Sequence, residues 1–189
     1  MPGIGVDKRV REAARPSAVV RYAAVWMTVG AALAALAVTV LDEPAPRATL
    51  PPIHETRLLD AVRTADCQLR RLDEHEPLRP PVDGPSGTPA RATFYTTAPP
   101  VRRLTAALRR GVIVIYYGRR VHGDRLDLLR ALQMLVPQGT IVAPDTTGMR
   151  YEVAAAAYRR LLGCARFTDA TVDAIRLFRG RHIGTGPDR

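Results

Sequence analysis

The side chains of this sequence that could do chemistry are few and widely separated. The stretch GRRVHGDR holds His122 and Asp124, a histidine and a carboxylate of the kind used in acid–base or metal chemistry. The other histidines, His54, His75 and His182, are isolated in the sequence. A lone histidine beside a turn is usually a turn residue, and Asp124 also fits the N-cap of a following helix. These residues make a catalytic site only if folding brings them together.

Familiar catalytic motifs are absent from the sequence. It contains no G-x-S-x-G, no H-E-x-x-H and no glycine-rich loop suited to cradle phosphate between a strand and a helix. Cys67 and Cys164 are the only cysteines, too few and too far apart to suggest a zinc site or a C-x-x-C redox pair. No metal or other cofactor is expected.

Arginine is the most abundant group with binding potential. The net charge is +10, and every basic residue except Lys8 is arginine. Six of them flank the apolar run VIVIYY and could form one anion-binding surface, although a solvated surface without a ligand is an equally good interpretation. They are Arg102, Arg103, Arg109, Arg110, Arg119 and Arg120.

One segment predicts a membrane anchor. Residues 22–41 carry no charge, and a helix of this length, rising ~1.5 Å per residue, spans the ~30 Å hydrocarbon core. A cleaved signal peptide is the alternative, but its apolar region is shorter, about 7–15 residues, and no convincing cleavage site follows here. Basic residues concentrate before the span, so the amino terminus is expected in the cytoplasm and the rest outside it.

This topology has consequences for bonding and partners. Cys67 and Cys164 both fall on the exported side, where two thiols usually pair, so we expect a disulfide. An exported domain meets no genomic nucleic acid. Its arginines would instead face anionic lipid headgroups or a cell-envelope polymer.

The chain after the span predicts one small α/β domain with helices packed on a short sheet. The full organisation is a cytoplasmic tail (1–21), the transmembrane helix (22–41), a proline-rich stalk (42–53) and the extracytoplasmic domain (54–189). The first expected element is a helix from Leu58; because Cys67 falls off its apolar stripe, either the helix ends near Ala65 or the cysteine reaches a second element. The other expected elements are a short strand at 93–97, a short helix closed by Gly111, a doubly buried strand at 112–117, a helix stopped by Pro137, a second buried strand at 139–144, an alanine-rich helix at 152–162 ended by Gly163, and a last helix capped by Thr168 and ended before Gly180.

Four stretches together resemble a known bacterial family. PPVDGPS (80–86), FYTTAPP, LRRGVIVIYY (108–117) and the closing GPD look like the domain-of-unknown-function family 3105, with matches in order over about residues 60–188. Many members are anchored by one amino-terminal helix, and the cysteine spacing also fits. The family's backbone determinants are kept at Pro80, Pro81, Gly84, Pro85 and Gly111.

The departures from the family pattern concern its chemistry. The family reads S-G-P-H and H-x-L-E-H-G, where this chain has Ser86 and then Ala106, Arg109 and Arg110. Three histidines and a glutamate are replaced, which is the inventory of a metal or acid–base site. The arginines reverse the charge of the expected cleft between 80–88 and 108–111, where Asp83 is the one carboxylate anticipated nearby. No metal is expected there, and any ligand should be an anion.

Three hypotheses follow. The first is a membrane-anchored extracytoplasmic interaction or structural module without catalysis. The second is an exported hydrolase or metal-dependent enzyme whose site lies outside the family motif and joins His122 and Asp124 with another acidic residue. The third is a binder of an anion or envelope polymer that uses the arginines as one patch.

Overall fold

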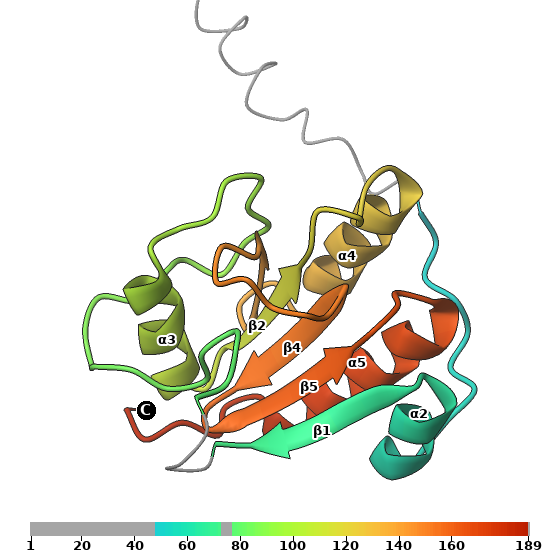
Figure 1. Ribbon diagram of the computed structural model, residues 1–189, viewed down its shortest axis with the longest axis horizontal. Helices are drawn as coiled ribbons and strands as arrows, with labels where there is room; N and C mark the ends of the chain where they lie inside the picture. Colours follow the sequence, from blue (N-terminus) through green and yellow to red (C-terminus); the bar gives the residue numbers. More distant parts are fainter. Residues whose placement is uncertain (1–47, 73–76, 189) are drawn as a thin grey trace, which may run out of the picture. The chain divides into compact units, whose positions relative to one another are not determined.

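The computed structural model describes residues 48–72 and 77–188. Within them the chain forms a five-stranded sheet with four helices, in the order α2 (Leu58–Thr64), β1 (Cys67–Arg71), α3 (Val101–Arg109), β2 (Ile113–Tyr117), α4 (Asp124–Leu135), β3 (Thr140–Pro144), β4 (Val153–Ala157), β5 (Arg160–Cys164) and α5 (Asp169–His182) (Figure 1). The α/β class predicted from the sequence is confirmed. No helix within the described residues is long and apolar enough to cross a bilayer, and the predicted span at 22–41 lies outside them.

The strand order is β1-β5-β4-β2-β3. Strands β2 and β3 are parallel and are joined through α4, whereas the other neighbouring pairs are antiparallel. At the outer edge of β3, Tyr95 donates its amide to Val142 at 2.8 Å, and Val142 donates to Thr93 at 3.1 Å. The strand expected at 93–97 is therefore reduced to a single bridge at Phe94.

Helices and loops cover both faces of the sheet. Ile113, Ile115 and Tyr117 of β2 pack in the core that includes α2, α4 and α5. Val114 and Tyr116 point into the opposite core, which is made by α3 and the loop residues 78–90. All five residues of β2 are buried, which explains its uninterrupted apolar sequence.

The alanine-rich helix predicted at 152–162 is wrong, because this segment forms the hairpin of β4 and β5. Alanine has the highest helix propensity, but propensity is a weak influence where tertiary packing decides. Ala154 to Ala157 are wholly buried, with neighbouring strands on both sides and a core on each face. Gly163 ends no helix: it lies inside β5, and a Cβ there would overlap the ring of Tyr151.

Two helix ends also differ from the predictions. Asp124 is the first residue of α4, after Gly123 as its N-cap, and Gly180 lies inside α5, which continues to His182. Thr168 does cap α5, since its amide bonds the hydroxyl of Thr171 at 3.2 Å. Helix α2 ends before Cys67, which begins β1.

The predicted disulfide is confirmed. Cys67 and Cys164 are directly opposite in the β1–β5 pair, with Cα atoms 4.2 Å apart, and their sulfurs are bonded. The bond links the edge strand β1 to β5 in the interior of the sheet. It therefore fixes the amino-terminal part of the domain to a strand far along the chain.

Candidate functional site

The loop that carries PPVDGPS lies against α3, with the Arg79–Pro80 peptide in the cis form. Val82 is buried in the core beneath α3, and a Cβ on Gly84 would overlap the side chain of Thr105. Glycine at 84 is therefore needed for the loop to approach the helix. This contact brings Asp83 and Ser86 to the carboxyl-terminal end of α3.

The carboxyl-terminal segment reaches the same end of α3. Gly184 donates its amide to the carbonyl of Gly111 at 2.7 Å, and Asp188 donates to the carbonyl of Arg109 at 2.9 Å. The last carbonyls of a helix have no partner within the helix, so this segment supplies one to Arg109. Gly111 adopts φ 79°, the left-handed conformation that commonly ends a helix, and thereby confirms the predicted stop.

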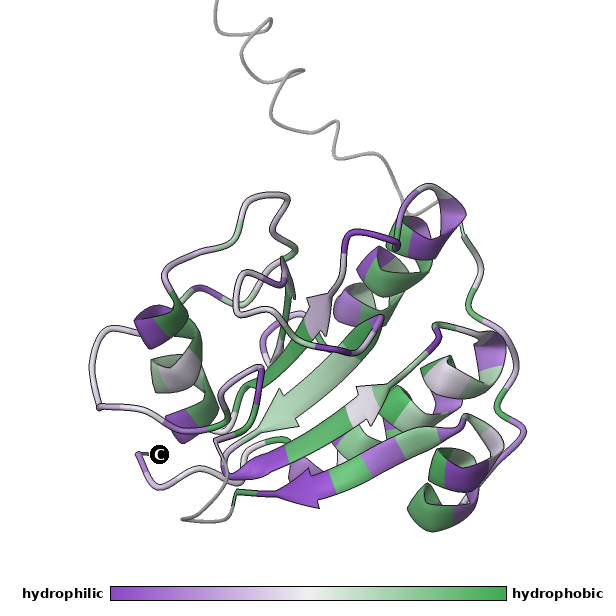
Figure 2. Ribbon diagram, viewed as in Figure 1, coloured by the Kyte–Doolittle hydropathy of each residue, from purple (hydrophilic) through white to green (hydrophobic). Residues whose placement is uncertain are grey.

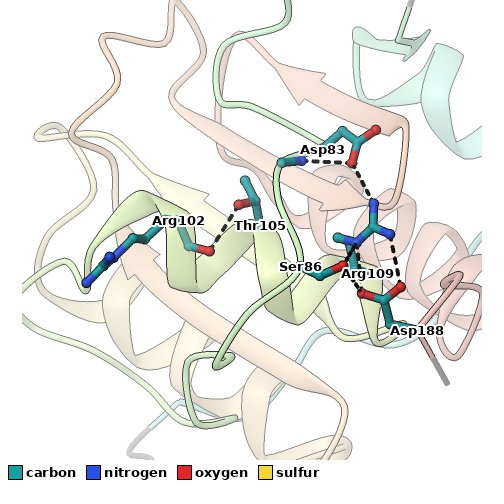
Figure 3. A network of polar contacts seen from close by, with 7 residues as sticks. Asp83, Ser86, Arg102, Thr105, Arg109 and Asp188 are labelled. Atoms are coloured by element: carbon teal, nitrogen blue, oxygen red, sulfur yellow. Dashed lines mark hydrogen bonds and ion pairs between the residues drawn. The ribbon is translucent and has the colours of Figure 1, made fainter.

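Arg109 lies at the centre of the site, between the loop and the carboxyl-terminal segment (Figure 3). Its Nε and Nη2 donate to the two carboxylate oxygens of Asp188 at 2.8 and 2.9 Å, a bidentate pair. Nε also lies 3.1 Å from the hydroxyl of Ser86, and Nη1 lies 3.5 Å from Asp83. The hydroxyl of Ser86 donates to Asp188 at 2.8 Å. We call these four residues the Arg109 cluster.

The charges of the Arg109 cluster are mutually satisfied. The hydrogen bond from Arg109, then that from Ser86, holds the pKa of Asp188 below its ordinary value. The same bond to Asp188 raises the pKa of Arg109 further above its already high value. Arg109 also lies 5.5 Å from the ring centroid of Tyr158, a favourable cation–π geometry. Neither partner is poised to exchange a proton near neutral pH, so the cluster is suited to holding segments together.

The expectation that Asp83 is the one carboxylate near the arginines is wrong. Asp188 also lies there and makes the closer contact to Arg109, at 2.8 Å against 3.5 Å for Asp83. The sequence held a signal for it, because GPD occupies the place of the family's closing P-E. A carboxylate of the chain itself thus occupies the position where an external anion was expected.

The six arginines predicted as one anion-binding patch occupy three places. Arg102 and Arg103 are exposed in the first turn of α3 and line a hollow of about 490 Å³ with residues 85–88. Arg109 and Arg110 are at the end of the same helix, and Arg119 and Arg120 are exposed in the turn after β2. The single patch stays a prediction, and Arg109 has its carboxylate partners already.

The other candidates for chemistry lie apart from the Arg109 cluster. Asp124 lines a hollow with Asp127 and Asp169, and His122 is not among its lining residues. His182 is buried against Phe178, and burial, followed by nearby arginines, lowers its pKa. In residues 48–72 and 77–188, no three histidine, cysteine, aspartate or glutamate side chains are placed to hold a metal ion.

Comparison with known proteins identifies the family. The model of the family described as "Protein of unknown function (DUF3105)" matches residues 77–184, more than half of the chain. No curated protein and no solved structure matches significantly. The chain belongs to the DUF3105 family, and the family assignment predicted from the sequence is confirmed.

Proposed function

We propose that this DUF3105 protein is a single-pass membrane protein whose α/β domain stands outside the cytoplasm as a non-catalytic structural or interaction module. In this proposal, residues 22–41 anchor the chain and the domain presents its surface to a partner in the cell envelope. The family description assigns no activity, so the proposal depends on the chemistry of this chain's own residues.

The Arg109 cluster is the observation that carries the proposal. The four family motif positions that could supply acid–base groups hold Ser86, Ala106, Arg109 and Arg110 here. Arg109 joins α3 to the 83–86 loop and to Asp188 through ion pairs and hydrogen bonds. A guanidinium stays charged at all physiological pH values and cannot serve as a general base there. The motif site of this chain therefore favours a role in holding three segments in place.

Two features support the proposed location. The bonded pair Cys67–Cys164 is typical of proteins that fold in an oxidising compartment. The uncharged stretch at 22–41 is long enough to span a bilayer, and the basic residues before it favour a cytoplasmic amino terminus.

The enzyme alternative finds less support in the described geometry. It requires His122 and Asp124 to converge with another acidic side chain in one pocket. Asp124 does line one hollow with Asp127 and Asp169, but neither a histidine nor a cysteine is among the lining residues.

Replacement of these candidate groups tests the proposal. The double variant His122→Ala/Asp124→Ala should complement a strain from which the gene has been deleted as fully as the wild-type chain does, when both are present in the membrane at equal abundance. Arg109→Gln should lose function only to the extent that it lowers the abundance of folded protein. Loss of function in the first variant at full abundance would favour the enzyme alternative and contradict a non-catalytic role.

A further inference from the structure

Two arginines face each other across the edge of the sheet. In the antiparallel pairing of β1 with β5, Arg71 lies directly opposite Arg160, at the end of both strands. Like charges directly opposite in such a pair are destabilising. Figure 2 shows the carboxyl end of β1 and the beginning of β5 as one hydrophilic region beside the apolar interior of the sheet. The fold thus places two positive charges opposite each other. A pair of uncharged side chains at these two positions would make the folded sheet more stable.

A third arginine is held beside this pair in an unfavourable backbone conformation. Arg159, in the turn between β4 and β5, has φ 57°, in the left-handed region that favours glycine. Its amide donates to Val82 at 2.9 Å, and its carbonyl accepts from Leu72 at 3.1 Å, so the backbone is fixed on both sides. Strained backbone held by its surroundings is common at binding sites.

The three arginines line one hollow of about 430 Å³, together with Leu72, Tyr158 and Thr185. Among the residues that the structure describes, the guanidinium groups of Arg71, Arg159 and Arg160 have neither a carboxylate within ion-pair distance nor a hydrogen-bond acceptor. Arg181 adds positive charge nearby: burial, then Arg71 and Arg181, lowers the pKa of Arg160. Within residues 48–72 and 77–188, this hollow therefore has positive charge without the carboxylate partners that the Arg109 cluster has.

We propose that Arg71, Arg159 and Arg160 form a binding site for a phosphoryl group, located where the β4–β5 turn meets the carboxyl end of β1. Guanidinium groups bind phosphate oxygens through paired, charge-assisted hydrogen bonds. Three arginines on one hollow match the several acceptors and multiple charge of a phosphoryl group better than a single carboxylate. A bound phosphoryl group would also remove the repulsion between Arg71 and Arg160.

This site differs from the anion-binding surface expected from the sequence, since none of its three arginines belongs to that set. The sequence also places Asp73, Glu74 and Glu76 directly after Leu72, outside the described residues. The experiment therefore includes a variant in which these carboxylates become amides, so that any competition from them is measured.

The experiment measures binding to the full-length chain in neutral detergent micelles at low ionic strength. Inorganic pyrophosphate is the soluble probe, and short-chain phosphatidylglycerol added to the same micelles is the lipid probe. Arg71→Gln and Arg160→Gln remove one guanidinium each. Arg166→Gln, which replaces an exposed arginine in the loop before α5, is the matched control.

We expect the wild type and Arg166→Gln to bind at least one of the two probes equally well. Arg71→Gln and Arg160→Gln should each bind that probe at least roughly tenfold more weakly, because each loses one charged hydrogen bond to the phosphoryl group. Binding of pyrophosphate identifies a soluble phosphate ligand, and binding of phosphatidylglycerol alone identifies a lipid headgroup. The variant Asp73→Asn/Glu74→Gln/Glu76→Gln should bind at least as tightly as the wild type. Absence of binding to both probes, an equal loss in Arg166→Gln, or weaker binding by the amide variant would overturn the proposal.

Discussion

Removal of the Cys67–Cys164 bond should destabilise the domain strongly. The bond joins residues 97 positions apart, so it restricts a large part of the unfolded chain. In the chain-entropy model a loop of that length corresponds to about 4.7 kcal/mol at 25 °C. We therefore expect Cys67→Ala/Cys164→Ala to lose about 4–5 kcal/mol of unfolding free energy, which for a domain of this size lowers the melting temperature by roughly 10–20 °C.

Urea unfolding followed by circular dichroism measures this loss. The dependence of free energy on urea should also steepen, because the unfolded chain without the bond is more expanded. Reductant should bring the wild type to the stability of the double variant and leave the double variant unchanged. A loss below about 1 kcal/mol would refute the reasoning, because it would mean that the bond does not restrict the unfolded chain as the model requires.

Three further outcomes are expected. Gly163→Ala should lower the free energy of unfolding by about 1–3 kcal/mol, because the added Cβ would overlap the ring of Tyr151. Gly180→Ala, with open space around it in α5, should raise the free energy of unfolding by about 0.5–1 kcal/mol. Equal effects of the two substitutions in urea unfolding would contradict this reasoning. Because the pKa of Asp188 is lowered by folding, its contribution to stability is present above the ordinary value of 3.8 and is lost as the pH falls through the lower folded-state value. The wild type should therefore be more stable than Asp188→Asn near neutral pH and approach it below about pH 4, and a difference independent of pH would argue against the ion pair. Arg109→Gln should increase amide hydrogen exchange in residues 80–88 and 184–188 but not in β2, and unchanged exchange in both segments would exclude a joining role.

The sequence predicted the regular elements wherever one pattern pointed to one structure. The run at 112–117 is β-branched or aromatic at every position, and its last five residues form the buried strand β2. Pro137 and Gly111 end their helices as expected because each acts locally, one by lacking an amide hydrogen and the other by accepting a left-handed conformation.

The β4–β5 hairpin could not be predicted in the same way. Four consecutive alanines favour a helix locally, and only the strands on either side and the cores on both faces make them a strand. The turn residues do not predict a hairpin either. Tyr158 and Arg159 are not typical of a hairpin turn, and Arg159 adopts a positive φ without being glycine.

The candidate site was predictable in part. The replacements at Ser86 and Arg109 were visible against the family pattern, and they do lie together. The partner Asp188 comes from the end of the chain, and only the folded structure shows that it caps α3. Arg71, Arg159 and Arg160 were missed because strand register, which the sequence does not give, places the first opposite the third.

The most direct test of the central claim is protease accessibility of the full-length chain with a carboxyl-terminal tag, in intact cells stripped of their outer envelope layers. If residues 22–41 anchor an exported domain, external protease should remove the tag without detergent, while an untreated sample keeps the full-length chain in the membrane fraction. A tag that is protected until detergent is added, or a shortened soluble chain in the untreated sample, would contradict the proposed topology.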